Sequence, residues 1–134
     1  GYNSIGDEGA TTLAAILKET KITHLGLYLN NIGDEGASAL AAILKETKIT
    51  NLNIGSNDIG NEGASALAAI LKETQITHLR LVCNDLGPDA GAALAEGLKG
   101  NSTLQVLDLR NNYLNDQAKQ ALKDAAGSGV DIQF

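Results

Sequence analysis

Two stretches of this chain of 134 residues are almost the same. Residues 34–50 (DEGASALAAILKETKIT) and residues 61–77 (NEGASALAAILKETQIT) differ at only two positions. Around them, the motif Leu-x-x-Leu-x-Leu-x-x-Asn, with Ile at some of the Leu positions, ends at Asn30, Asn57, Asn84 and Asn112. With Asn3 included, these asparagines recur every 27 or 28 residues. Repetition at a fixed period in this range indicates a solenoid, in which each unit packs only on its neighbours.

Each repeat contains one strand pattern and one helix pattern. Leu25 and Leu27 alternate with Gly26 and Tyr28, which predicts a short strand with the leucines on one face. After a turn at residues 32–33, Asp34 stands where a helix N-cap is expected. The apolar spacing i, i+3, i+4, i+7 then predicts a helix, with its buried face at Ala37, Leu40, Ala41 and Leu44. In the fourth repeat Pro88 takes the place of Asp34, which suits a first helical position.

This arrangement resembles the leucine-rich-repeat family. Units of 27–28 residues with a full helix after the asparagine are similar to the ribonuclease-inhibitor subtype, which also occurs in NOD-like receptors and Ran GTPase-activating proteins. The resemblance covers practically the whole chain. It implies an α/β fold: a right-handed horseshoe with a parallel sheet on the concave side and helices on the convex side. It also implies that the concave sheet recognises other proteins.

The pattern predicts one domain over residues 1–134, made of about five helical units. Residues 1–3 align with residues 55–57, so we expect no N-terminal cap, an uncovered flank on the first helix and an unprotected strand edge at residues 25–27. Lys119 and Lys123 replace small residues in the last unit, which predicts that residues 112–134 form a C-terminal capping unit. We therefore expect the C-terminal part of a longer solenoid.

Composition argues against several classes of function. The net charge is −6, and the lysines lie beside glutamates, so we expect neither nucleic acid nor an anionic membrane surface as a partner. No apolar run approaches the ~18 residues that a membrane span needs. Cys83 is the only cysteine, so no internal disulfide can form. This favours a reducing compartment, and we expect a cytoplasmic protein.

No residue pattern indicates catalysis, a metal or a cofactor. His24 and His78 occupy the same motif position two repeats apart, but no further ligand completes a zinc site. Cys83 has no base or acidic partner placed for it, so we expect no catalytic thiol. The repeated sequence Gly-Asp-Glu-Gly lacks the Lys and Ser/Thr of a phosphate loop, so it is read as a turn and a helix start. The motif asparagines are predicted to be structural, each bonded to backbone groups of its own and neighbouring loops.

The sequence varies most where the repeat does not dictate it, on the open face of the sheet. We expect this face to bind a partner protein through Tyr28, His78, Arg80 and Arg110, surrounded by His24, Asn51, Asn53, Val82 and Asp108. An ion pair between Arg80 and Asp108 on adjacent strands is also predicted. Part of the face would then neutralise its own charges and would not need a partner.

Three alternatives to a partner-binding face stay open. The variation can be neutral. The uncapped N-terminal edge can instead form a homodimer. By analogy with the family alone, the chain can regulate an enzyme such as a GTPase.

Overall fold

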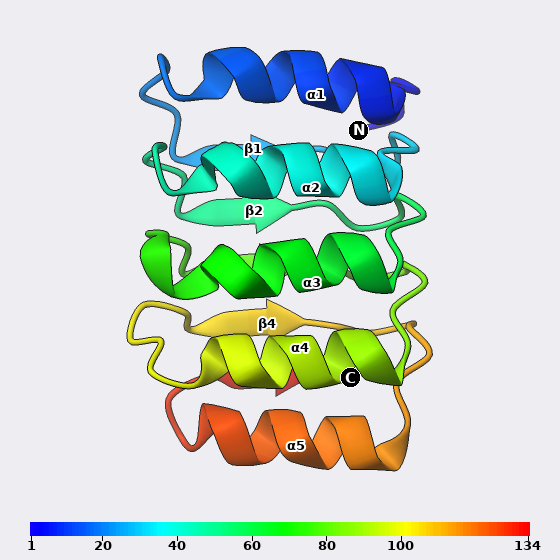
Figure 1. Ribbon diagram of the computed structural model, residues 1–134, viewed down its shortest axis with the longest axis vertical. Coiled ribbons are helices and arrows are strands. Elements are labelled where there is room, and N and C mark those ends of the chain that lie inside the picture. The colour runs from blue at the N-terminus through cyan, green and yellow to red at the C-terminus, as the bar shows by residue number, and fades with distance from the viewer.

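The computed structural model describes all residues from Gly1 to Phe134 as one stack of alternating helices and strands (Figure 1). The helices are α1 (Gly6–Leu17), α2 (Gly33–Leu44), α3 (Asn61–Ile70), α4 (Pro88–Leu98) and α5 (Asp116–Ala126), with a short 3-10 helix η1 (Leu71–Glu73) after α3. The strands are β1 (His24–Gly26), β2 (Asn51–Asn53), β3 (His78–Arg80), β4 (Val106–Asp108) and β5 (Asp131–Gln133).

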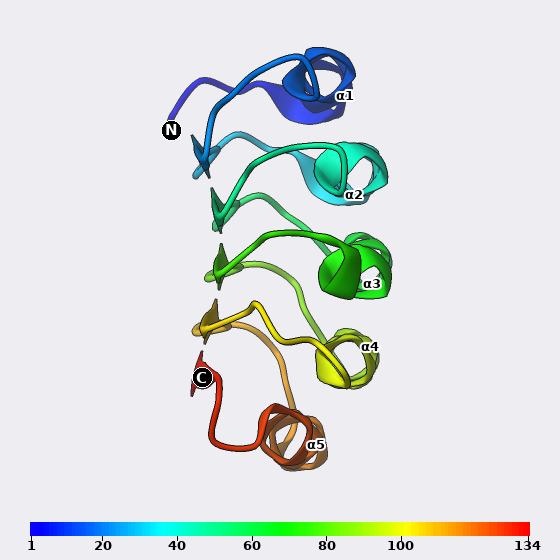
Figure 2. The same ribbon diagram turned by 90° about the vertical axis from the view of Figure 1, so that its left-hand side faces the viewer.

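The strands form one parallel sheet in the order β1-β2-β3-β4-β5. Each repeat pairs in register with the next, so that Leu25, Leu52 and Leu79 align across the first three strands. Figure 2 shows the strands closer together than the helices, which places the sheet on the inside of a curve and the helices on the outside. The predicted horseshoe of α/β repeats is confirmed.

One continuous core of Leu, Ile and Ala side chains fills the space between the two layers. The last apolar residue of each strand motif (Leu27, Ile54, Leu81 and Leu109) is almost completely buried, and so are the helical residues Leu40, Leu67 and Leu94. Because each unit supplies the same few side chains at the same places, successive units interlock without large aromatics. No helix is both long enough and apolar enough to cross a bilayer.

The motif asparagines form a ladder of hydrogen bonds that joins each repeat to the next. The side-chain oxygen of Asn57 accepts from the backbone N–H of Asn30, and that of Asn84 accepts from the N–H of Asn57. The Asn57 side-chain nitrogen donates to the carbonyls of Leu27 and Gly55. These bonds satisfy backbone groups that would otherwise be buried without partners. The prediction that these asparagines are structural is confirmed.

The helix caps differ from the sequence prediction. Asp34 does not cap its own helix, which begins at Gly33 without a side-chain cap. Its carboxylate instead accepts from the N–H groups of Gly60 and Gly63 at the start of α3, at 2.9 and 2.6 Å. Asp7 likewise accepts from Gly36 in α2, and Asn61 serves α4 in the same way. Adjacent parallel helices lie side by side, so a side chain in the first turn of one reaches the free donors of the next.

Pro88 ends this pattern. It occupies the first turn of α4, as predicted, but has no side-chain acceptor to offer to α5. In α5 the cap is local: the Asn115 side chain accepts from the N–H of Ala118 at 2.8 Å. Helices α2, α3 and α4 are therefore capped by side chains of the preceding helix, whereas α5 is capped by the residue just before it.

Candidate binding face

The in-register sheet arranges the predicted site residues in rows on its open face. His24, Asn51, His78 and Val106 form one row, and Gly26, Asn53, Arg80 and Asp108 form a second. The neighbouring leucines point into the core, as the alternating burial of β2 and β3 shows. Tyr28, Val82 and Arg110 follow two residues after the second row. The structure thus brings all nine predicted residues onto the same face, as the alternation of strand side chains requires.

The histidines are held by their neighbours in sequence. The hydroxyl of Thr77 lies 2.9 Å from Nδ1 of His78, and Thr23 stands in the same relation to His24. Between them, the Thr50 hydroxyl donates to the side chain of Asn51. Each ring therefore has one nitrogen held by the threonine that precedes it. No cluster of three or more His, Cys, Asp or Glu side chains is placed to hold a metal ion.

Tyr28 is the aromatic centre of the third row. A Cβ added to Gly55 would lie 3.2 Å from the Tyr28 ring and 2.7 Å from a methyl of Val82, so this glycine lets the two side chains approach each other. Tyr2 packs edge-on against Tyr28, with 6.1 Å between ring centroids, and is itself 79% exposed. Tyr2 was not among the predicted contacts. It aligns with Ser56, so an aromatic at that repeat position was the available signal.

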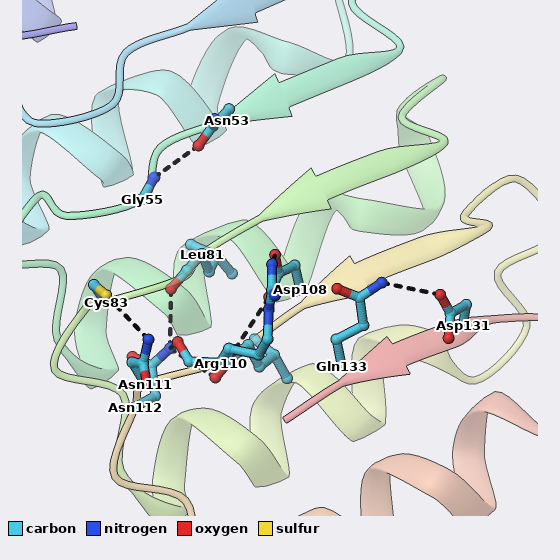
Figure 3. A network of polar contacts seen from close by, with 11 residues as sticks. Asn53, Gly55, Leu81, Cys83, Asp108, Arg110, Asn111, Asn112, Asp131 and Gln133 are labelled. Carbon is cyan, nitrogen blue, oxygen red and sulfur yellow. Dashed lines mark hydrogen bonds and ion pairs between the residues drawn. The ribbon is translucent and has the colours of Figure 1, made fainter.

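Asp108 is paired with Arg110 rather than with Arg80, so the predicted cross-strand ion pair is wrong (Figure 3). Nε of Arg110 donates to one carboxylate oxygen at 2.9 Å and Nη2 to the other at 2.7 Å. The cause is the spacing i, i+2, which places both side chains on one face of one strand and lets the guanidinium meet the carboxylate with two parallel bonds.

This pair changes the titration of both groups. The side-chain hydrogen bond from Arg110 lowers the pKa of Asp108, against the opposing effect of burial, because Asp108 is only 2% exposed. In return, the bond to Asp108 raises the pKa of Arg110. Asp108 is thus an internal counter-ion, and only Arg110 of the two presents its surface to a partner.

Arg80 lies in the middle strand of the sheet and forms no ion pair within the chain. Its side chain is half-buried. The carboxylate opposite it on β4, that of Asp108, has both oxygens bonded to Arg110. Arg80 therefore contributes a charge that the chain itself does not neutralise by contact.

Other polar groups near the face have structural partners. Cys83 is exposed, and its thiol accepts from the side-chain amide of Asn111 at 3.5 Å (Figure 3). The open hollows of the molecule lie elsewhere, between the convex helices. One of about 360 Å³ is lined by Ala68 and Gly97, where a glycine in α4 replaces the isoleucine of earlier repeats. The rest of its wall consists of small residues and exposed charged side chains, of which Lys99 and Glu96 are paired with each other.

Comparison with known proteins agrees with this architecture. A family model described as leucine-rich repeat matches residues 1–14, 18–41, 45–68, 74–95 and 100–122. Among solved structures, the chain is similar to one named Leiomodin-1 Actin-Binding Site 2, with a TM-score of 0.80 and 18% identity over 90% of this chain and 77% of that chain. Identity at this level shows a shared fold alone. A search of curated proteins finds no match to the sequence.

Proposed function

The chain belongs to the leucine-rich-repeat family, and we propose that it is a protein-interaction module that binds a partner protein through the open face of its sheet. One observation carries the proposal: the side chains that the repeat leaves free gather on this face, and they include Arg80, which forms no ion pair within the chain. Tyr and Arg are the residue types that most often dominate binding energy.

The side chains of this face are held in place before any partner binds. Its side chains stand on strands joined by the asparagine ladder, and several are already held by neighbours, as with His78 and Arg110. A preordered surface loses little conformational entropy when a partner binds. The sheet is narrow, with strands about 4.8 Å apart, so we expect modest affinity for this chain alone.

We also propose the repeat subtype, the compartment and the kinds of partner that are excluded. The repeat length and the full helix after each asparagine favour the ribonuclease-inhibitor-like subtype. The arrangement offers no nucleophile with a base, so we assign no enzymatic activity. The lone Cys83 favours a reducing compartment such as the cytoplasm. The acid excess argues against nucleic acid or an anionic membrane as the partner.

Capture of partners from a native lysate tests the face. The variant Tyr28→Ala, Arg80→Ala, Arg110→Ala should lose a partner that the unchanged chain retains. A matched control with Glu35→Ala, Lys72→Ala and Gln117→Ala, all exposed on the convex side, should retain it. Because a structural neighbour carries an actin-binding name, filamentous actin in a sedimentation assay is a defined first ligand. Equal retention by both variants would assign binding to another surface.

A second candidate function is self-association through the flank of the first repeat, and exposure favours it. Ile22 is 39% exposed, whereas its equivalent Ile49 is 1% exposed, and Ile16 on α1 is 54% exposed. Covering such a surface with a second copy would remove apolar area from water. Mass in solution, measured over a wide range of concentrations, should then rise with concentration. A constant monomer mass would reject this function while leaving binding by the sheet face untouched.

A further inference from the structure

The charge of Arg80 has no direct partner, although an arginine with a carboxylate partner lies close by. Arg110 uses Nε and Nη2 to hold both oxygens of Asp108. Arg80 has the same fork of donors but makes no ion pair, and it acts on Asp108 only through space by lowering its pKa. Of the two arginines on this face, Arg110 is therefore bonded to a carboxylate of the chain, and Arg80 is not.

The surroundings of Arg80 contain no free anion. Asn53, beside it on β2, uses its side-chain oxygen to accept from the N–H of Gly55. On its own strand the flanking residues are His78 and Val82. Asp131 lies two strands away on β5, where the side chain of Gln133 donates to it. The acid opposite Arg80 is Asp108 on β4, and Arg110 already holds both of its carboxylate oxygens.

An apolar contact surface adjoins the charge. Val82 follows Arg80 on the same face and packs toward Tyr28 above Gly55. In the row that crosses the strands from Arg80 through Asn53 to Gly26, a Cβ added to Gly26 would meet no atom within 4 Å. A ligand that sits on Arg80 thus has an aliphatic and an aromatic side chain, Val82 and Tyr28, close by on the same face.

We propose that the sheet face takes a partner segment with one side-chain carboxylate, which binds the Arg80 guanidinium, and an apolar side chain next to it, which packs on Tyr28 and Val82. This inference rests on the proposed function and adds the chemistry of the partner. Arginine pairs with a carboxylate through two parallel hydrogen bonds, which fixes the position of the segment. Elsewhere the chain carries an acid excess, with a net charge of −6, so a carboxylate finds few other favourable sites.

Selection from a library of random peptides displayed on phage tests the proposal without a known partner. The bait is the immobilised chain, in parallel with Arg80→Gln and with Lys72→Gln, which removes an exposed cation on the convex side. The unchanged chain and Lys72→Gln should enrich peptides with Asp or Glu beside an apolar residue. One such synthetic peptide should bind Arg80→Gln about tenfold more weakly, as should the same peptide with its acid replaced by the amide.

The outcomes distinguish failure of the carboxylate proposal from failure of the proposed binding by the sheet face. Enriched peptides without acid preference that still require Tyr28 would reject the carboxylate proposal and leave the sheet face as the binding surface. Peptides that bind the Tyr28→Ala, Arg80→Ala, Arg110→Ala variant as tightly as the unchanged chain would reject both. Equal enrichment of acids by Arg80→Gln, or no enriched sequence at all from the unchanged chain, would also overturn the proposal and leave Arg80 as a distant counter-ion of Asp108.

Discussion

The two ends of the stack are built from equivalent positions but face their surroundings differently. On the flank of α1, Leu13 is partly exposed, whereas its equivalent Leu40 in α2 is fully buried. On the flank of α5, lysines replace the small residues of earlier repeats, and the Nζ atoms of Lys119 and Lys123 lie 5.8 and 5.6 Å from the centre of the Phe134 ring. The flank of α1 thus carries the apolar residues of an interior repeat, whereas the flank of α5 carries lysines.

This difference shows that burial in a solenoid depends on the neighbour as much as on the residue. Identical leucines stabilise the fold by different amounts according to whether the next unit covers them, because stability is a sum of units and of interfaces between them. A flank that keeps interior residues therefore invites a contact, and a flank that changes them to lysine does not. The following changes test how far the two ends differ.

The largest effect is expected from a matched pair of leucines. Leu40→Ala should lower the free energy of unfolding by about 3 kcal/mol, since it leaves a cavity in a fully buried site. Leu13→Ala, the same change on the open flank, should cost about 1 kcal/mol. Urea unfolding followed by circular dichroism measures both. Equal losses would mean that the first flank is covered in solution.

A smaller effect is expected from removing a cap that crosses between repeats. Asp34→Ala should cost about 1.5 kcal/mol, because the N–H groups of Gly60 and Gly63 lose their acceptor. Amide hydrogen exchange should show the loss of protection at the start of α3 rather than in α2. As a control, Asn115→Ala should loosen only α5, its own helix. Loss of protection confined to α2 would contradict the crossed arrangement.

The pairing of Asp108 makes the C-terminal half sensitive to acid. Its pKa is lowered below the ordinary value of 3.8, so its contribution is fully present above that value and is lost as the pH falls through the lowered pKa. Asp108→Asn should cost about 1 kcal/mol at neutral pH. It should also flatten the fall in stability below about pH 4, measured by thermal unfolding across pH. A variant as acid-sensitive as the unchanged chain would show that other carboxylates dominate.

The smallest effect is expected on the open flank itself. Ile16→Lys should change the free energy of unfolding by less than about 0.5 kcal/mol, because the side chain is 54% exposed. Its matched control is Phe134→Ala at the other end, which should cost about 1 kcal/mol through lost contact with the two lysines and the core. Chemical denaturation measures both. A large loss from Ile16→Lys would reveal a contact that monomeric packing does not provide.

The repeat pattern alone predicted most of the fold. A fixed period together with two apolar spacings leaves few ways to stack the units, so the sheet, the helices and the asparagine ladder were all foreseeable. Asp34 was placed correctly in sequence but assigned to the wrong helix, because a cap across repeats depends on how far one helix is displaced from the next. The partner of Asp108 was also mistaken: Arg80 lies opposite it on β3 and Arg110 two residues further along the chain, and only side-chain geometry chooses between them.

The crossed caps also bear on how such an array can lengthen. A copy of the α2 or α3 unit brings an Asp or Asn for its successor and receives one from its predecessor, so its own helix and the next one both keep a cap. Residues 34–50 and 61–77, the nearly identical pair, lie in this region. A copy inserted after Pro88 would inherit no acceptor and would need its own, as α5 has in Asn115. Pro88 therefore marks the point in the chain after which a helix must carry its own cap.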